Sequence, residues 1–366
     1  MNENKLLAIL ALQAAPGIGD ITAKKLIAQC GSPEAIFSTS KRSLEQIDGI
    51  GSFISGTLSD VMNFKKAEKE LSYIQKNKIQ CHYFEDSSYP KGLKHCADGP
   101  ILLFSSGNIQ IQNQPVVSIV GTRRASVRGT MFCEQLIEQL STFNPIIASG
   151  FAYGIDITAH KTAMKYNLQT LACLAHGIQK CYPSGHIKYR KQIEANGGFY
   201  SDFWSDTLFE KSNFVKRNRI IAGLSSATIV IESSERGGSL ITADMAFDYN
   251  REVFAVPGRP SDKMSQGCNN LIKIQKAHVL TSATDIISHL NWEEKKSLPS
   301  HQKKLFVELS DNEQVVLSSL QKSGNENLDE IALSSQKSIS EVATILFGLE
   351  LKGLVRALPG KSYEAI

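Results

Sequence analysis

Paired cysteines are missing from this sequence. Seven cysteines are scattered along the chain and none forms a Cys-x-x-Cys pair. This pattern argues against a disulfide framework and against a zinc site built on thiolates. We therefore expect free thiols and no bound metal.

Long apolar runs are missing too. No stretch reaches the ~18–20 apolar residues that a membrane helix needs. The N-terminal MNENKLLAIL also lacks a basic region followed by an apolar run and a small-residue cleavage site. We expect a cytoplasmic protein with no membrane partner.

The sequence also lacks the common nucleotide-binding fingerprints. The first predicted strand of the central region is followed by Gly121 alone rather than by G-x-G-x-x-G, and GxxxxGK[ST] occurs nowhere. A nucleotide cofactor is therefore disfavoured, and we expect none, although the sheet predicted below is of a kind that can hold one.

Positive charge is concentrated in the middle of the chain. Residues 115–292 carry 19 Lys and Arg against 14 Asp and Glu, whereas the whole chain has a net charge of +4. Residues 1–90 are neutral overall, and residues 311–366 have a net charge of −3. A polyanion is therefore expected to meet the middle region.

The 366 residues are too many for one ordinary domain. Residues 1–75 read as helices, with an internal repeat around Pro16-Gly17-Ile18-Gly19 and Asp48-Gly49-Ile50-Gly51. Residues 76–114 are turn-rich and read as a connector at the start of a second domain, 76–292.

Short β-branched or apolar runs alternate with helical segments in the middle region. This alternation predicts an α/β domain with a mostly parallel, Rossmann-like sheet covered on both faces. The predicted strands are 116–120, 146–149, 170–175, 228–232 and 253–256. Residues 293–310 read as a charged linker, and residues 311–366 as three short helices and a strand-turn-strand, the order of a winged helix.

The loops that follow the first two strands carry candidate phosphate ligands. Glycine loops and helix N-termini at the carboxyl ends of parallel strands are suited to anions. Gly121, Arg123 and Arg124 follow the first strand, and Ser126 is a candidate helix cap. The second strand ends in Ser149-Gly150-Phe151-Ala152-Tyr153, followed by Asp156, another candidate cap, and by His160, which we interpret as a hydrogen-bonded structural residue.

The later loops add further basic residues. Lys180 follows the third strand, while Lys188, Arg190 and Lys191 fit a solvated helix face equally well. Lys216, Arg217, Asn218 and Arg219 precede an apolar helix, a density that contacts to a sugar-phosphate backbone would explain. The glycine loop at 235–242 is by itself a weak signal.

Seven ordered motifs together resemble the DNA-processing protein A (DprA, also called Smf) family: VSIVGTRRAS, ASGFAYGIDITAH, HGIQKCYP, RNRIIAGLS, ERGGSLITA, REVFAVPG and GCNNLI. The resemblance covers about residues 80–292 closely. It implies a non-enzymatic protein that binds single-stranded DNA without sequence preference, protects incoming strands in natural transformation, helps to load the RecA recombinase and forms a homodimer through the Rossmann-like domain.

Carried over to this chain, the resemblance makes Arg123, Arg217 and Arg219 the basic anchors, with Gly121 and Gly150 shaping the pocket floor. The chain departs from the family pattern at Tyr153, Gln179 and Val215, where many members have a basic residue, an aspartate and a proline. Tyr153 could then offer a stacking face for a base. The predicted DNA-binding residues are Gly121, Arg123, Arg124, Ser149, Gly150, Tyr153, Lys180, Lys216, Arg217, Asn218 and Arg219.

The flanking regions leave alternatives open. The N-terminal repeat resembles paired helix-hairpin-helix motifs in a SAM-like domain, whose role is DNA contact or packing alone. The expected recognition helix of the C-terminal region, residues 338–351, contains Glu341 and Glu350 but no Lys or Arg, which favours protein contact or regulation. The competing function for the whole chain is a nucleotide-hydrolysing Rossmann-like enzyme, although no matching PGGxGT-type loop is present.

Overall fold

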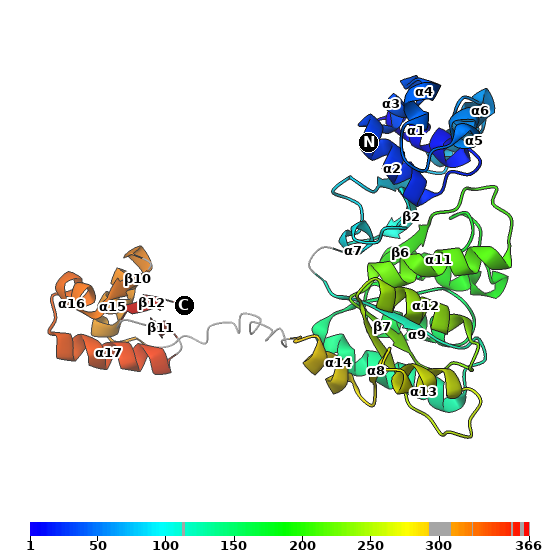
Figure 1. Cartoon of the computed structure of the whole chain (residues 1–366). Helices are drawn as coiled ribbons and strands as arrows, with labels where there is room; N and C mark the ends of the chain where they lie inside the picture. The colour runs from blue at the N-terminus through cyan, green and yellow to red at the C-terminus, as the bar shows by residue number, and fades with distance from the viewer. Residues whose placement is uncertain (112–113, 293–308, 324, 353, 359–361, 366) are drawn as a thin grey trace. The chain divides into compact units, whose positions relative to one another are not determined.

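The chain forms two compact units, Met1–Glu294 and Lys295–Ile366 (Figure 1). The computed structural model describes residues 1–111, 114–292, 309–323, 325–352, 354–358 and 362–365. The predicted linker, residues 293–310, falls almost entirely outside these described residues.

The first unit begins with six helices joined by tight turns. In the predicted repeat, Gly17 and Gly49 have φ values of 81° and 80°, a conformation that suits glycine. Gly19 and Gly51 then precede the next helix with nearly equal backbone angles, φ −93° and ψ 175° against φ −85° and ψ 176°. The repeat is therefore confirmed at the level of the backbone. The helices are α1 (Glu3–Ala14), α2 (Asp20–Cys30), α3 (Pro33–Ser38), α4 (Lys41–Glu45), α5 (Ser52–Leu58) and α6 (Val61–Lys76).

A nine-stranded sheet follows in the order β1-β2-β6-β5-β4-β3-β7-β8-β9. The seven strands from β6 to β9 are parallel, whereas β1 and β2 join antiparallel at one edge. This confirms the mostly parallel sheet. The strands are β1 (Gln80–Tyr83), β2 (Leu102–Asn108), β3 (Val116–Val120), β4 (Ile146–Ser149), β5 (Thr170–Cys173), β6 (Gly197–Ser201), β7 (Ala227–Val230), β8 (Glu252–Ala255) and β9 (His278–Val279).

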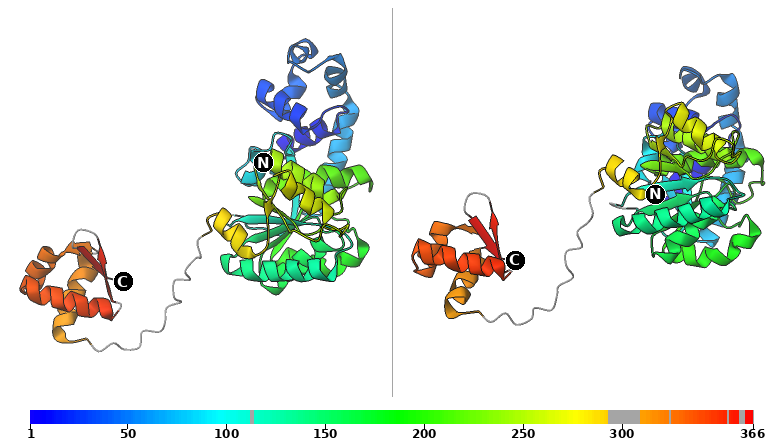
Figure 2. Two further views of the ribbon diagram at one scale, coloured as in Figure 1. Left: turned by 60° about the horizontal axis from the view of Figure 1, so that its bottom comes forward. Right: turned by 90° about the horizontal axis from the view of Figure 1, so that it is seen from below.

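Helices cover both faces of this sheet (Figure 2). Because alternate residues of a strand point to opposite faces, Val116 and Val120 of β3 join one core cluster, while Val117 and Ile119 join another. The first cluster packs under α11, α12 and α13, and the second under α8, α9 and α14. The helices that alternate with the strands are α7 (Lys91–Lys94), α8 (Val127–Leu140), α9 (Ile155–Lys165), α10 (Arg190–Ala195), α11 (Lys211–Leu224), α12 (Gly238–Asp248), α13 (Gln266–Lys273) and α14 (Ala283–His289), with 3-10 turns η1 (Ser141–Phe143) and η2 (Ser184–Tyr189).

The N-terminal helices share their core with the sheet. Ile9 and Leu10 of α1 belong to one buried cluster with Phe104 of β2 and Phe199 of β6. The segment 76–114 is more than the expected connector, because it contributes β1 and β2 to the sheet. Its polar and turn-rich stretches concealed these edge strands.

The described residues of the second unit form three helices and a three-stranded antiparallel sheet of order β10-β12-β11. Val316, Leu320, Ile331, Val342 and Leu346 form its core. The predicted winged-helix architecture is confirmed, with one short strand, β10, that was not expected. The elements are α15 (Asp311–Ser323), β10 (Asn325–Asn327), α16 (Leu328–Ser335), α17 (Ile339–Leu351), β11 (Val355–Leu358) and β12 (Ser362–Ala365).

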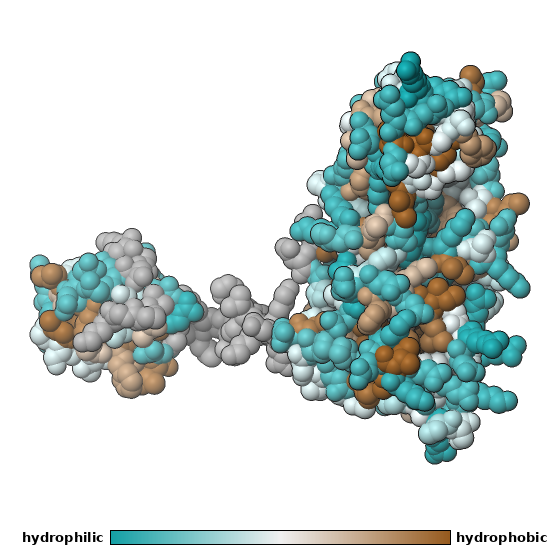
Figure 3. Space-filling model, in the orientation of Figure 1, coloured by the Kyte–Doolittle hydropathy of each residue, from teal (hydrophilic) through white to brown (hydrophobic). Residues whose placement is uncertain are grey.

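The surface carries no large apolar band on the side that Figure 3 shows, where hydrophobic side chains of the first unit gather in separate groups among hydrophilic ones. Of the helices in the described part of the chain, none is both long and apolar enough to cross a membrane.

Candidate nucleic-acid interface

A pocket of about 270 Å³ lies where the strand order reverses. Strand β3 has β4 on one side and β7 on the other, so the loops after these three strands diverge and leave a crevice at their carboxyl ends. Helix α11 and the start of α12 complete the lining. This is the position at which open parallel sheets bind their ligands.

The loop after β3 provides one wall of the pocket. Gly121 and Arg123 both line it. A Cβ atom on Gly121 would come within 2.6 Å of the Ile155 side chain, so only glycine lets this loop lie so close to α9. Arg123 is exposed, and its guanidinium carbon lies 5.2 Å from the centroid of the Phe214 ring. Arg123 is therefore held over an aromatic face while its charge stays accessible.

The neighbours of Arg123 have different roles. Arg124 is exposed, and its backbone N–H donates to Thr122 Oγ1 at 3.1 Å. Ser126 caps α8, as expected, by accepting the Gly129 N–H at 3.0 Å. The Ser126 N–H also donates to the Glu232 carboxylate at 2.9 Å, which ties the loop after β3 to the end of β7.

The floor of the pocket holds a buried arginine. Arg217 is 4% exposed. Its Nη1 donates to the carbonyl oxygens of Gly150, at 2.6 Å, and Cys173. A Cβ on Gly150 would fall 2.8 Å from Arg217 Nη2 and 2.7 Å from the Asp156 carboxylate, so the floor needs glycine here. The Arg217 guanidinium is thus committed to the protein backbone.

Asp156 is the acidic partner in this floor. It does not cap α9, because the N-cap is Gly154; instead its Oδ2 accepts the Ala152 N–H at 3.2 Å. Burial raises the pKa of the Asp156 carboxyl, and the positive charge of Arg217 opposes this rise. Burial also lowers the pKa of the Arg217 guanidinium, and Asp156 opposes that change. Arg217 Nε remains buried without a partner among the described residues.

Helix α11 divides the predicted basic cluster between two sides. The cluster was expected to precede the helix. It lies inside the helix instead, because α11 begins at Lys211. Residues three and four apart share a helix face. Arg217 and Asn218 therefore line the pocket together with Phe214, whereas Lys216 and Arg219 line a separate groove beside the N-terminal helices.

Arg219 links the sheet to the N-terminal helices. Its Nη2 lies 2.8 Å from the Asp20 carboxylate at the start of α2 and 2.5 Å from the Asp202 carboxylate that follows β6. Its Nη1 donates to the Asp98 carbonyl oxygen. The guanidinium is therefore engaged within the chain, while the Lys216 side chain is exposed.

Seven of the eleven predicted DNA-binding residues are not among those that line the pocket: Arg124, Ser149, Gly150, Tyr153, Lys180, Lys216 and Arg219. Ser149 is fully buried, and its hydroxyl donates to the Ile119 carbonyl at 2.6 Å. Tyr153 is 52% exposed. Its ring packs edge-on against the His186 ring, with the two ring centroids 4.8 Å apart. Lys180 donates to the Thr207 carbonyl at 2.9 Å. Lys216 and Arg219 line the separate groove. A DNA contact by any of these seven remains a prediction.

His160 has the structural role expected of it. It is fully buried and its Nδ1 lies 2.7 Å from Thr170 Oγ1. Burial lowers the pKa of His160 to about 3, so the imidazole is neutral at physiological pH.

The sequence patterns did not predict two features of the pocket. The first is the start of α12, where Gly237, Gly238 and Ser239 line the pocket and no side chain caps the helix. Its first N–H groups thus lack intrahelical partners and point a partial positive charge toward the pocket. The glycines at 237 and 238 were the available signal.

The second feature is an aromatic strip that runs from the pocket. The ring centroids of Phe214 and Tyr182 are 5.8 Å apart, and those of Tyr182 and Phe209 are 5.5 Å apart. Lys180 Nζ lies 5.7 Å from the Phe209 ring centroid. Tyr182 and Phe209 are 44% and 48% exposed. Partly exposed aromatic faces with cations at both ends form a platform on which flat, anionic ligands can stack.

Comparison with known proteins identifies the family. The family model for DNA recombination-mediator protein A matches residues 80–291, which include the pocket, and the model for the DprA winged helix domain matches residues 306–361. The chain belongs to the DprA family.

Its relatives include the protein Smf of Escherichia coli, 33% identical over 81% of this chain and 80% of the relative. The Synechocystis protein Smf is 28% identical over 97% of both chains. Among solved structures, that of DNA processing protein A from Streptococcus pneumoniae is 29% identical, has a TM-score of 0.67, and matches over 78% of this chain and 98% of its own.

A second structural relative is DNA processing protein A from Helicobacter pylori, 27% identical with a TM-score of 0.53 over 58% of this chain and 98% of that one. That structure was described for its single-stranded DNA binding mode. The predicted DprA membership is therefore confirmed.

Proposed function

We propose that this protein binds single-stranded DNA without sequence preference, with one phosphate in the pocket at the carboxyl ends of β3, β4 and β7. The observation that carries the proposal is the exposed Arg123, which lies over Phe214 in a pocket also lined by the uncapped start of α12. An arginine fork and free helix N–H groups together suit a phosphate. The single-strand binding mode described for the Helicobacter pylori relative supports this proposal.

The aromatic strip favours a single strand over a duplex. Phe214, Tyr182 and Phe209 could stack only on bases that are not paired and stacked inside a double helix. Contacts of this kind tolerate any sequence, because every base has an aromatic face.

Within the pocket, the proposed division of labour is as follows. Arg123 and Asn218 contact the strand directly, with Arg124 and Lys216 supplying charge nearby. Arg217 is a positioning residue that fixes the Gly150 carbonyl and the pocket floor.

The proposal extends to the physiological role. We infer a cytoplasmic homodimer, formed through the Rossmann-like domain, that protects incoming DNA during natural transformation and assists RecA loading without catalytic turnover. The family membership supports this role.

The test is the affinity for fluorescent oligo-dT, measured by anisotropy across salt concentrations. Arg123→Ala is expected to weaken binding about tenfold, or ~1.4 kcal/mol. The slope of log affinity against log salt should fall by ~0.7, the share of one phosphate on a single strand. The matched control is Arg356→Ala on β11, whose side chain is 66% exposed and paired with Glu364, and it should bind like wild type.

Wild-type affinity of Arg123→Ala at low and moderate salt would show that the pocket is assigned wrongly. Incubation with nucleoside monophosphates tests the competing function. Release of free base would favour a nucleotide-hydrolysing enzyme.

A further inference from the structure

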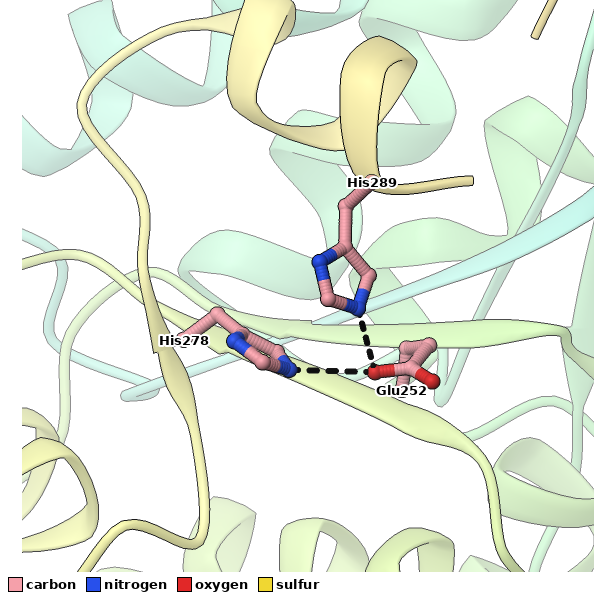
Figure 4. Close-up of side chains that lie close together, drawn as sticks. All are labelled: Glu252, His278 and His289. Carbon is pink, nitrogen blue, oxygen red and sulfur yellow. Dashed lines mark hydrogen bonds and ion pairs between the residues drawn. The ribbon is translucent and has the colours of Figure 1, made fainter. Parts of the chain in front are cut away.

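Two histidines and one glutamate converge at the β8–β9 edge of the sheet (Figure 4). His278 Nε2 and His289 Nε2 lie 3.1 Å and 2.9 Å from the same carboxylate oxygen, Glu252 Oε2. The three ligand atoms all lie within 4.8 Å of one another. Among the described residues, this is the one group of His, Cys, Asp or Glu close enough to hold a metal ion.

The local fold explains why these side chains meet. Glu252 and Phe254 are two residues apart on β8 and so share one face of the sheet. His278 on β9 pairs with Phe254 in the parallel register. Helix α14 packs on this face through Ile286, and its last turn brings in His289.

The surroundings of the cluster favour a cation. Phe254 is 1% exposed, and its ring centroid lies 5.5 Å from each imidazole, so the site has an apolar floor. The imidazole centroids are only 4.0 Å apart. A cation held between the two imidazoles and the carboxylate would bind all three groups at once.

Nearby positive side chains do not take this role. Arg251 donates to the Gly92 carbonyl at 2.9 Å, and Lys276 pairs with Asp244 at 2.7 Å. In the described part of the chain, the Glu252 side chain has the two histidines as its recorded partners.

We propose that Glu252, His278 and His289 form a binding site for a divalent transition-metal ion, with Zn²⁺ as the best match. Two imidazoles and one carboxylate are a common zinc ligand set, whereas Mg²⁺ and Ca²⁺ prefer oxygen ligands throughout. With bonds of about 2.0–2.2 Å, ligand atoms around a tetrahedral zinc ion are ~3.3 Å apart. The observed separations of 2.9 Å and 3.1 Å therefore need to open only slightly.

The metal would act as a clip. It would join β8 to β9 and to α14, and leave a fourth position for water. Neither histidine Nδ1 has a partner among the described residues, and a hydrogen bond to the second ring nitrogen of a metal-binding histidine commonly strengthens metal binding 10–100-fold. We therefore expect a site weaker than a fully enclosed structural zinc site.

The first test is calorimetric titration of ZnCl₂ into the full chain, prepared without a polyhistidine tag and stripped with chelator. Wild type is expected to bind one Zn²⁺ per chain, and His289→Ala and Glu252→Gln should each bind at least tenfold more weakly. The matched control is His95→Ala, an exposed histidine outside the cluster, which should bind like wild type.

Co²⁺ absorption separates this site from the free cysteines, because binding without thiolates gives visible bands but no thiolate-to-metal charge-transfer band. Zn²⁺ should also raise the Tm of wild type but not that of His289→Ala, whose metal-free Tm should match wild type. Absence of saturable binding at micromolar Zn²⁺, or unchanged affinity in His289→Ala, would overturn the proposal.

The result of the metal-binding test is independent of the result of the DNA-binding test. Glu252 opens β8, whereas the DNA pocket lies at the carboxyl ends of the strands. Chelation is therefore expected to leave the oligo-dT affinity unchanged.

Discussion

The two units differ in how deeply they bury charged side chains. The first unit buries Asp156 and Arg217 in the floor of its pocket. The second unit keeps its charged groups nearer the surface, as in the pair between Arg356 and Glu364, whose side chains are 66% and 29% exposed. Among the described residues of the second unit, Ser335 is the one buried polar side chain.

This difference indicates where ligand binding is concentrated. A buried charge is costly unless its partners are placed accurately, and groups of this kind gather at functional sites. Exposed pairs contribute little to stability and impose little geometry. The winged-helix fold alone would suggest DNA binding by the second unit, but the arrangement of charge points to the first.

The largest predicted effect comes from removing the buried charge of the first unit. Arg217→Ala leaves the carbonyls of Gly150 and Cys173 without donors and Asp156 without its cation. We expect the free energy of unfolding of the first unit to fall by about 3 kcal/mol. Urea titration with tryptophan fluorescence measures this change, because both tryptophans of the chain, Trp204 and Trp292, lie in this unit.

The matched control is the exposed neighbour Lys216→Ala, which should change stability by no more than ~0.5 kcal/mol. A loss below ~1 kcal/mol in Arg217→Ala would contradict the role of this arginine as a positioning residue.

The next effect concerns pH. His160 has a pKa of about 3 in the folded chain, against 6.5 when unperturbed. Between these values the unfolded chain binds more protons, so stability falls as the pH falls and is unaffected by His160 above pH 7. Lowering the pH from 7 to 5 should therefore cost the first unit about 2 kcal/mol through this residue.

Urea titrations at pH 7 and pH 5 test this expectation. His160→Asn should lose part of the pH dependence, even though other histidines of the unit contribute to the wild-type slope. An identical change of unfolding free energy with pH in both proteins would rule out His160 as a source.

A smaller effect is expected on the pocket wall. Phe214→Ala removes the ring that supports Arg123 and begins the aromatic strip. Its oligo-dT affinity should fall about tenfold, or ~1.4 kcal/mol, while Phe214→Tyr should stay within about twofold. Anisotropy titration measures both, and equal losses in the two variants would argue against stacking.

The smallest effect is expected from the second unit. A chain ending at residue 292 should bind oligo-dT within about threefold of the full chain, since α17 has Glu341 and Glu350 but no Lys or Arg. Phe347 and Leu351 of α17 are exposed, which favours a protein partner for this helix. A loss of tenfold or more on truncation would show that the contrast between the two units is wrong.

The sequence predicted those parts of the fold that follow from local periodicity. β3, β4 and β5 are short buried runs followed by glycine loops, and they were found almost to the residue. β6 was not predicted because it begins with Gly197 and Gly198, which are poor strand formers in isolation. In the folded chain both are required, since a Cβ on either would come within 2.1 Å of a neighbouring carbonyl oxygen.

The candidate site was predicted in location rather than in detail. Arg123 was correctly placed at the end of β3, and Arg217 and Asn218 reach the same pocket. Burial could not be foreseen from Lys216-Arg217-Asn218-Arg219, because four adjacent residues point in four directions around a helix. Phe214 would have been found by applying a three-residue spacing back from Arg217.

The ion pairs of Arg219 also bear on how the chain is made. Asp20 leaves the ribosome roughly 200 residues before Arg219, which corresponds to ~10–40 s of synthesis at ordinary rates. The apolar side of the N-terminal helices likewise waits for Phe199 of β6. During this interval the N-terminal helices cannot complete their packing, so the first unit becomes vulnerable to aggregation or proteolysis while it is still attached to the ribosome.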